Sequence, residues 1–167
     1  RETISIGGIT RFSATDYPDH FSAVIFLEGC HWRCVYCNNT HLQLRTKQTQ
    51  FKWAEVRQWL GQRKGLIDAV VFSGGEPCAD PGLSKAIREV KALGFKVGLH
   101  TACIYPRRLM RVLPLLDWVG FDIKAPFGHY DSITGIARSG DPAQLSAQAI
   151  LAQGVAYEFR TTLHSTL

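Results

Sequence analysis

Short apolar runs alternate with helical segments along this chain, and that alternation limits the possible folds more than any other feature. The runs with the length and flanking glycines of buried strands span 21–28, 68–75, 95–101, 117–124 and 155–163. The segments with apolar residues at helical spacing span 52–62, 80–94, 106–112 and 141–154. Strands that alternate with helices form parallel sheets joined by right-handed crossovers. The sequence therefore predicts an α/β protein.

Unusual residues follow the carboxyl ends of the predicted strands, which is where parallel α/β folds place their chemistry. Along the chain they are Cys30, "GGEP" at 74–77, "HTAC" at 100–103, "DIK" at 122–124 and Arg160. Five clusters at one rim indicate a single site for a large ligand. An open doubly wound sheet and a barrel both fit this pattern, but five strands are too few to close an eight-stranded barrel. We therefore expect a partial (β/α) barrel.

The chain has the length of one domain, so we expect residues 1–167 to form a single unit. The stretch "TISIGGITRF" at 3–12 alternates around a Gly-Gly pair and predicts a short hairpin, which makes residues 1–20 an appendage to the sheet. The sequence ends on the fifth strand without a following helix. From this ending we expect the fold to be truncated after that strand, with its C-terminal part missing.

The composition is that of a globular protein, with 46% hydrophobic and 20% charged residues. No apolar run reaches the roughly 18 residues of a membrane span, and the N-terminus lacks the apolar core of a signal peptide. We therefore expect a cytoplasmic protein whose cysteines stay reduced. The net charge of +5 is scattered, which favours a solvated surface over a nucleic-acid face and leaves an anionic partner as the alternative.

Three cysteines at C-x3-C-x2-C spacing, Cys30, Cys34 and Cys37, indicate a metal centre. A structural zinc ion takes four ligands, and His31 or His41 could supply the fourth. An iron–sulfur cubane also takes four thiolates as a rule. With only three thiolates one iron keeps an open coordination site, and an open site is typical of a catalytic metal.

The motif "GGEP" at 74–77 favours the open cluster over the zinc ion. Its two glycines let the backbone approach a ligand closely after a strand. Glu76 adds a carboxylate suited to an ammonium group, and Pro77 stiffens the loop. Cys78 or Cys103 could instead complete the cluster from other loops, although both lie far along the chain.

The motifs "CHWRCVYC" and "GGEP" resemble those of the radical S-adenosylmethionine (SAM) superfamily. Within it, the chain most resembles the activating proteins of the anaerobic ribonucleoside-triphosphate reductase, which are glycyl-radical activases. The likeness runs over nearly the whole chain. The further stretches that carry it are "GGITRFSATDYPD", "GLHTACIYP", "WVGFDIKAPFGHYDSITG" and "YEFRTT".

The resemblance implies a site built around a 4Fe–4S cluster and SAM. Cys30, Cys34 and Cys37 would each bind one iron, and SAM would chelate the fourth through its amino and carboxylate groups. The other residues implied at the cofactor are Tyr36 near the adenine, Gly74, Gly75, Glu76 and Pro77 at the SAM ammonium, Asp122 and Lys124 at the carboxylate and ribose side, and Arg160 beside SAM.

Two of these assignments, and one further candidate, rest on residue types that have ordinary roles as well. Arg160 offers a guanidinium fork for the SAM carboxylate, whereas alone it would be a routine surface arginine. Asp122 could instead form a salt bridge with Lys124. His100, at the end of the third strand, is a further candidate at the cofactor, with a hydrogen-bonding wall residue as the alternative.

By the same resemblance, the reduced cluster would cleave SAM to methionine and a 5′-deoxyadenosyl radical. That radical would take a hydrogen from a glycine Cα on the partner, an anaerobic ribonucleoside-triphosphate reductase, and leave a stored glycyl radical. An electron donor such as flavodoxin would reduce the cluster. The cofactors carry this chemistry, so the sequence nominates no acid–base side chain.

The sequence departs from the family pattern at two positions. The family commonly has histidine after the third cysteine of the motif, whereas this chain has Asn38, a change that could tune the cluster potential. The usual glycine of "HTAG" is Cys103 here, which we interpret as a passive small apolar residue. Neither change removes a cluster ligand.

Two other functions remain open. One is a radical SAM enzyme that acts on a small heterocycle, resembling 7-carboxy-7-deazaguanine synthase. The other is a zinc-binding module for nucleic acid, in keeping with the pI near 9.1.

Overall fold

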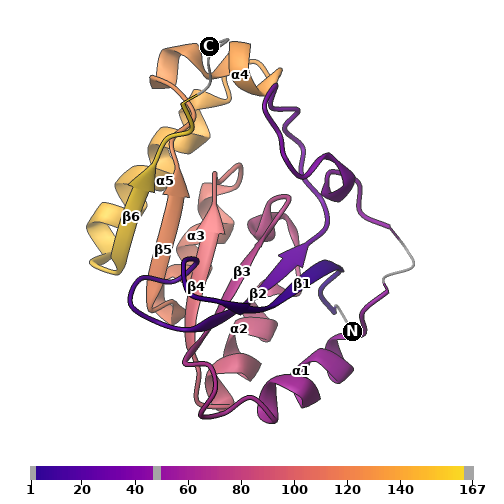
Figure 1. Cartoon of the computed structure of the whole chain (residues 1–167). Helices are drawn as coiled ribbons and strands as arrows, with labels where there is room; N and C mark the ends of the chain where they lie inside the picture. Colours follow the sequence, from indigo (N-terminus) through magenta and orange to yellow (C-terminus); the bar gives the residue numbers. More distant parts are fainter. Residues whose placement is uncertain (1–2, 47–49, 164–167) are drawn as a thin grey trace.

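The computed structural model describes residues 3–46 and 50–163 and contains one six-stranded sheet (Figure 1). The strands lie in sequence order, with β1 antiparallel to β2 and all later neighbours parallel. Within the described residues the sheet stays open, with β1 and β6 at its edges, which confirms the predicted α/β partial barrel. The strands are β1 (Ile6–Ser13), β2 (Ser22–Leu27), β3 (Ala69–Gly74), β4 (Lys96–Thr101), β5 (Trp118–Asp122) and β6 (Ala156–Arg160).

Helices cover one face of the sheet. Strand residues at alternate positions, such as Ile25, Phe72 and Leu99, point to this layer and are fully buried in a core shared with α1, α2, α3 and α5. Full burial of one such side chain contributes about 1.5–3 kcal/mol. No helix in the described ranges is both long and apolar enough to cross a membrane. The helices are α1 (Trp53–Gly61), α2 (Leu83–Ala92), α3 (Pro106–Val112), α4 (Tyr130–Thr134) and α5 (Gly140–Gln153), with 3-10 turns η1 (Thr40–Leu42), η2 (Pro77–Ala79), η3 (Leu113–Leu115) and η4 (Phe127–His129).

Punctuation in the sequence predicts most helix ends correctly. Pro106 begins α3, and Gly154 follows α5 in the left-handed conformation at φ 73°. The helix predicted from residue 80 begins later than expected: α2 begins after Gly82, and the Asp80 carboxylate accepts a hydrogen bond from the Gly82 amide at 2.8 Å in the turn before the helix. Asp80 therefore organises the turn that leads into α2 rather than the helix end itself.

The predicted hairpin at 3–12 is wrong. Residues 6–13 form the single strand β1, and its partner is β2. The Gly-Gly pair lies inside β1 at a register shift, not in a turn. A Cβ on Gly7 would meet Leu42 at 2.3 Å and Glu28 at 3.0 Å, so the glycine is required by close packing against the segment that follows β2.

Helix α4 and the turn η4 before it were not expected from the sequence, because this segment is short and has no long apolar period. Two carbonyl groups of α4 accept hydrogen bonds from the loop that carries Cys30, Cys34 and Cys37. Arg33 N–H donates to Thr134 O at 2.9 Å, and Val35 N–H donates to Ile133 O at 3.0 Å. The segment therefore serves as a docking point for the loop that carries the cysteines.

The second face of the sheet is covered near its amino-terminal end by the connection between β1 and β2. Tyr17 from this connection is 5% exposed and packs with Val24, Val71 and Trp118. Its ring centroid lies 5.5 Å from that of Trp118. The opposite end of the same face is left for the loops after the parallel strands, of which the loop after β2 rises to α4 in Figure 1.

We predict that Tyr17→Ala lowers the free energy of unfolding by about 3–5 kcal/mol, because it leaves a cavity over Trp118. Tyr17→Phe keeps the ring and should cost about 1 kcal/mol or less. Phe12, which is 57% exposed, gives the matched control, and Phe12→Ala should change little. Urea unfolding of the anaerobically purified protein measures all three. Equal losses for Tyr17→Ala and Phe12→Ala would contradict the packing role.

Candidate active site

A cavity of about 180 Å³ lies at the carboxyl ends of β3, β4 and β5, beneath the cysteine segment. It brings together ten of the twelve residues that the sequence singled out. Pro77 and Arg160 are the two that do not line it. The predicted residues that line it are Cys30, Cys34, Tyr36, Cys37, Gly74, Gly75, Glu76, His100, Asp122 and Lys124.

Residues 28–46, called here the cysteine loop, follow β2 and fold back, so that the later part of the loop lies against its beginning. Gly29 N–H donates to Leu42 O at 2.7 Å, and Cys30 N–H donates to Gln43 O at 2.9 Å. These two bonds close the base of the loop. The tip docks on α4 as described above, so backbone contacts hold the cysteine motif at Cys30 and on either side of Cys34.

The three thiols are free and only half-buried, and they share one pocket. Burial raises the pKa of Cys30 to about 11, and negative charge on Glu76, Cys34 and Cys37 adds to the rise. Burial also raises the pKa of Cys34, against the opposing Lys124 ammonium. A metal cation binds thiolates and so releases the protons that this environment holds on Cys30 and Cys34.

A single metal ion fits this arrangement poorly. Among the described residues no three His, Cys, Asp or Glu side chains converge closely enough to hold one ion. His31 instead contacts the Tyr105 hydroxyl through its Nδ1, and His41 is exposed on η1. A cluster differs from one zinc ion because each cysteine binds its own iron, so the sulfurs need not meet at one point.

The "GGEP" segment runs directly against the base of the cysteine loop. Gly74 has a φ of 124°, and a Cβ there would lie 2.3 Å from Leu27 O. Gly75 N–H donates to Leu27 O at 2.9 Å, and Glu76 N–H donates to Gly29 O at 2.8 Å. The two loops therefore form one backbone unit, in which the glycines are required by close contact between main chains.

Glu76 is 1% exposed, and its carboxylate is fully engaged by the protein. Oε1 accepts from Cys78 N at 2.9 Å and Thr101 Oγ1 at 2.7 Å. Oε2 accepts from Ala102 N at 3.2 Å and Cys103 N at 3.1 Å. Burial raises the pKa of Glu76, and these donors oppose the rise. The side chain thus ties the loop after β3 to the loop after β4.

The carboxyl end of β5 carries an ion pair at the edge of the cavity. Arg160 Nε lies 3.7 Å from Asp122 Oδ1, and the guanidinium lies over the Trp118 ring at 5.8 Å. The parallel pairing of β5 with β6 places Arg160 opposite Asp122. Gly120 leaves room for the Arg160 side chain, because a Cβ at this position would lie 2.6 Å from Arg160 Nη2. Asp122 therefore pairs with Arg160, whereas Lys124 lies over the Tyr36 ring at 5.4 Å.

His100 is a wall residue held by the β1–β2 connection. Its Nε2 donates to Asp16 O at 2.8 Å, because a carbonyl oxygen can only accept. Burial lowers the pKa of His100, and the charge of Arg160 lowers it further. Burial raises the pKa of Tyr36 to about 12, with added effects of Cys34 and Asp122. Both rings are therefore uncharged at neutral pH.

The two remaining cysteines stand behind the cavity rather than in it. Cys78 is 2% exposed and Cys103 is 0% exposed, and both belong to the core. Cys103 has a φ of 43°, the left-handed region in which glycine is usual. The burial of Cys103 agrees with its expected passive role. Neither Cys78 nor Cys103 lines the pocket that the other three cysteines share.

Further residues line the cavity beyond those assigned to the cofactors from the sequence. Ser73 and Thr101 lie at the ends of β3 and β4, and Ala102 belongs to "HTAC", so their strand-end position was a usable signal. Trp32, Asn38 and Asn39 lie in or beside the cysteine motif, and Asn38 was already noted there. The others come from contacts between distant segments and carried no local signal. The additional lining residues are Trp32, Asn38, Asn39, Gln43, Ser73, Thr101, Ala102, Ile104 and Thr162.

Comparison with known families shows which family the chain belongs to. The sequence profile described as "Radical SAM superfamily" matches residues 24–150. The chain belongs to the radical SAM superfamily. Enzymes of this family use a 4Fe–4S cluster and SAM, and these are therefore the cofactors of this chain. The three free thiols line one pocket beside a glycine-rich loop. This set of donors fits such a cluster with one iron left for SAM.

One similar curated protein comes from Methanocaldococcus jannaschii and bears a name that provisionally describes a glycyl-radical enzyme activating enzyme. It is 32% identical over 140 residues, which are 81% of this chain and 57% of that protein. The chain thus spans little more than half the length of this relative.

Solved structures of similar fold share little sequence with the chain. QueE from Escherichia coli has a TM-score of 0.54 at 13% identity and covers 95% of this chain and 94% of its own. SuiB from Streptococcus suis bound to the precursor peptide SuiA has a TM-score of 0.65 at 16% identity, over 85% of this chain and 33% of its own. SuiB bound to S-adenosylmethionine scores 0.59 at 14% identity, over 86% and 32%. These likenesses show the fold.

We predict that Gly74→Ala lowers the free energy of unfolding by at least about 3 kcal/mol, because a Cβ at φ 124° is strained and overlaps the Leu27 backbone. Gly61 at the end of α1 has no heavy atom within 4 Å of its Cβ position. Gly61→Ala should therefore be neutral or stabilise by up to about 1 kcal/mol. Urea denaturation compares the two variants. A Gly74→Ala protein as stable as Gly61→Ala would refute the close approach of the two loops.

Proposed function

We propose that this radical SAM enzyme is an activase that generates a glycyl radical on a partner protein, an anaerobic ribonucleoside-triphosphate reductase. The observation that carries the proposal is the 32% identity, over 81% of the chain, with the Methanocaldococcus jannaschii protein named for glycyl-radical activation. The bound cofactors supply a 5′-deoxyadenosyl radical that can take a hydrogen from a glycine Cα. The protein's own part is to bind, orient and exclude water.

Cys30, Cys34 and Cys37 hold the cluster in this proposal. Their half-buried thiols open into the same cavity, and their backbone is fixed at the base of the cysteine loop and at α4. Asn38 follows the third cysteine on the cavity wall, where its amide can donate to cluster or SAM atoms. With three thiolates supplied, one iron would be left for the amino and carboxylate groups of SAM.

The residues that would bind SAM line the rim formed by β3, β4 and β5. The proposed contacts at its amino group come from Gly74, Gly75 and the rest of "GGEP", which line the cavity except for buried Pro77. Glu76 acts there by fixing the loop, because its oxygens already accept four hydrogen bonds. Tyr36, next to the cysteines, offers an uncharged ring for the adenine.

The carboxylate and ribose side of SAM faces the end of β5. Asp122 and Lys124 line the cavity, and Arg160 stands behind Asp122 in an ion pair. In this arrangement Arg160 acts on SAM through Asp122, and the half-buried Lys124 supplies the positive charge for the SAM carboxylate. His100 closes the wall between these groups, held by its bond to Asp16 O.

A polypeptide substrate is supported by a second, larger cavity of about 830 Å³ beside the first. The two cavities share Lys124 and Thr162. Val35, which is 66% exposed, and Leu163, which is 93% exposed, stand at its mouth. In the activase proposal, the glycine-bearing segment of the partner reaches the cofactor pocket through this partly apolar opening.

A small-molecule radical SAM enzyme is the second candidate, favoured by the match of QueE over nearly equal chain lengths. That match is one of fold at 13% identity, so it ranks below the activase. In the proposed setting the protein works in the reducing cytoplasm, where an electron donor such as flavodoxin reduces the cluster.

Electron paramagnetic resonance (EPR) after anaerobic mixing with SAM, reductant and candidate reductase tests the proposal. Wild-type protein should produce a glycyl-radical signal on the reductase, and Cys34→Ala should produce none because it lacks a cluster ligand. Cys78→Ala, which changes a buried thiol outside the cavity, is the control and should retain the signal. SAM cleavage with many turnovers but no radical on any reductase would overturn the activase and favour a small-molecule enzyme.

A further inference from the structure

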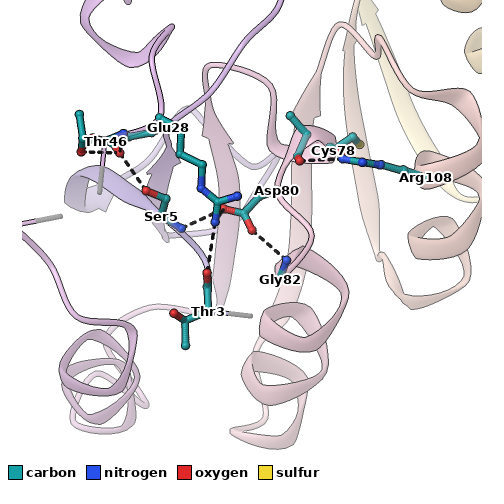
Figure 2. A network of polar contacts seen from close by, with 10 residues as sticks. Thr3, Ser5, Glu28, Thr46, Cys78, Asp80, Gly82 and Arg108 are labelled. Atoms are coloured by element: carbon teal, nitrogen blue, oxygen red, sulfur yellow. Dashed lines mark hydrogen bonds and ion pairs between the residues drawn. The ribbon is translucent and has the colours of Figure 1, made fainter. Parts of the chain in front are cut away.

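Two buried carboxylates lie at the base of the cysteine loop, outside the cofactor cavity. Glu28 is 8% exposed and begins the loop, and Asp80 is 4% exposed and follows "GGEP" by one turn. Neither lines the cavity, and neither belongs to the cysteine or "GGEP" motif. Figure 2 shows both within one polar network.

Glu28 closes the cysteine loop. Its Oε2 accepts from Thr46 N at 2.9 Å and from Thr46 Oγ1 at 2.9 Å, which joins the first residue of the loop to the last. The same oxygen accepts from Ser5 Oγ at 2.8 Å. Cys30 lies two residues after Glu28, so this carboxylate ties the end of the cysteine loop to a point directly before the cysteine motif.

Asp80 holds the other side of the junction. Its Oδ2 accepts from Ser5 N at 2.9 Å, and its Oδ1 accepts from Gly82 N at 2.8 Å. Arg45, near the end of the cysteine loop, places Nη2 3.5 Å from Asp80 Oδ2. On its far side the 78–80 turn is held by Arg108, whose Nη1 donates to Ala79 O at 2.7 Å (Figure 2).

Ser5 therefore bridges the two carboxylates, with its backbone amide on Asp80 and its hydroxyl on Glu28. We propose that Glu28 and Asp80, joined through Ser5, are positioning residues that fix the cysteine loop against the SAM-binding loop. The proposal rests on the assignment of these two loops in the proposed function. Residues that support ligands from behind, as these do, commonly change metal affinity or activity by about 10–100-fold when they are replaced.

The two carboxylates should respond differently to replacement by their amides. Gln at position 28 can keep the network, because its oxygen can take the place of Oε2 and its NH2 can donate to Thr46 Oγ1. Asn at position 80 cannot, because Ser5 N and Gly82 N donate to different oxygens and the NH2 group would face one of these donors. This asymmetry distinguishes hydrogen-bonded positioning from a simple effect of charge.

The test compares Glu28→Ala, Glu28→Gln and Asp80→Asn in the reconstituted full chain at equal iron content. SAM affinity is measured from the change that SAM causes in the EPR signal of the reduced cluster. Hydrogen–deuterium exchange over residues 28–46 is measured without SAM. We expect Glu28→Ala and Asp80→Asn to weaken SAM binding by about tenfold or more and to speed exchange. Glu28→Gln should stay within about twofold of the wild type in both.

Glu89 provides the matched control, because it is also a carboxylate with two donors but lies in the helix layer. It accepts from Trp53 Nε1 at 2.6 Å and Arg57 Nη1 at 2.8 Å. Glu89→Ala should lower the unfolding midpoint without changing SAM affinity or the EPR signal. If Glu28→Ala does not fold, Ser5→Ala removes only the hydroxyl bridge and should still weaken SAM binding.

Unchanged SAM affinity in Glu28→Ala, or in Ser5→Ala where Glu28→Ala does not fold, would overturn the proposal. So would an equal loss in Glu89→Ala, since this would mean a general effect of stability. A failure of the proposed function can be told apart from a failure of this proposal, because SAM binding is measured without any reductase. A protein that forms no glycyl radical but loses SAM affinity in Glu28→Ala would refute the activase and retain the positioning network.

Discussion

The close approach of two backbones after β2 and β3 is the constraint on which the rest of the site depends. Gly74 can stand against Leu27 only because it has no Cβ, and this contact allows the main chains of the two loops to bond directly. Parallel pairing from β2 to β6 then brings the later strand ends to the same rim. The cysteine loop and the "GGEP" loop are thus parts of one rigid junction, and the cofactor cavity lies beneath it.

Buried carboxylates hold this junction in place, and each is fully used by protein donors. Glu76 links the loops after β3 and β4, while Glu28 closes the cysteine loop. Burial of a carboxylate without hydrogen-bond donors costs several kcal/mol. Loops that surround it with four or more hydrogen bonds are therefore strongly favoured in the one arrangement that makes those bonds. The arrangement leaves the three half-buried thiols outside any disulfide, on the wall of the same cavity.

The sequence predicts the layout of the fold well because its signals are local. Apolar runs locate the five parallel strands, and Pro106 and Gly154 mark helix ends. Strand-end position also predicts which motifs meet, since parallel strands share one carboxyl edge. The remainder depends on contacts between distant segments. The Gly-Gly pair in β1 is a bulge fitted against the cysteine loop, and the pairing of Asp122 with Arg160 follows from the β5–β6 register.

The central claim is that three cysteines and the adjacent glycine-rich loop leave one iron for SAM. Electron–nuclear double resonance of the reduced wild-type protein with SAM labelled at its amino nitrogen and carboxylate oxygen measures this directly. The structure predicts strong coupling of both labels to the cluster, as expected for direct chelation of one iron. Absence of coupling from both labels, in a protein that contains the intact cluster and bound SAM, would contradict it.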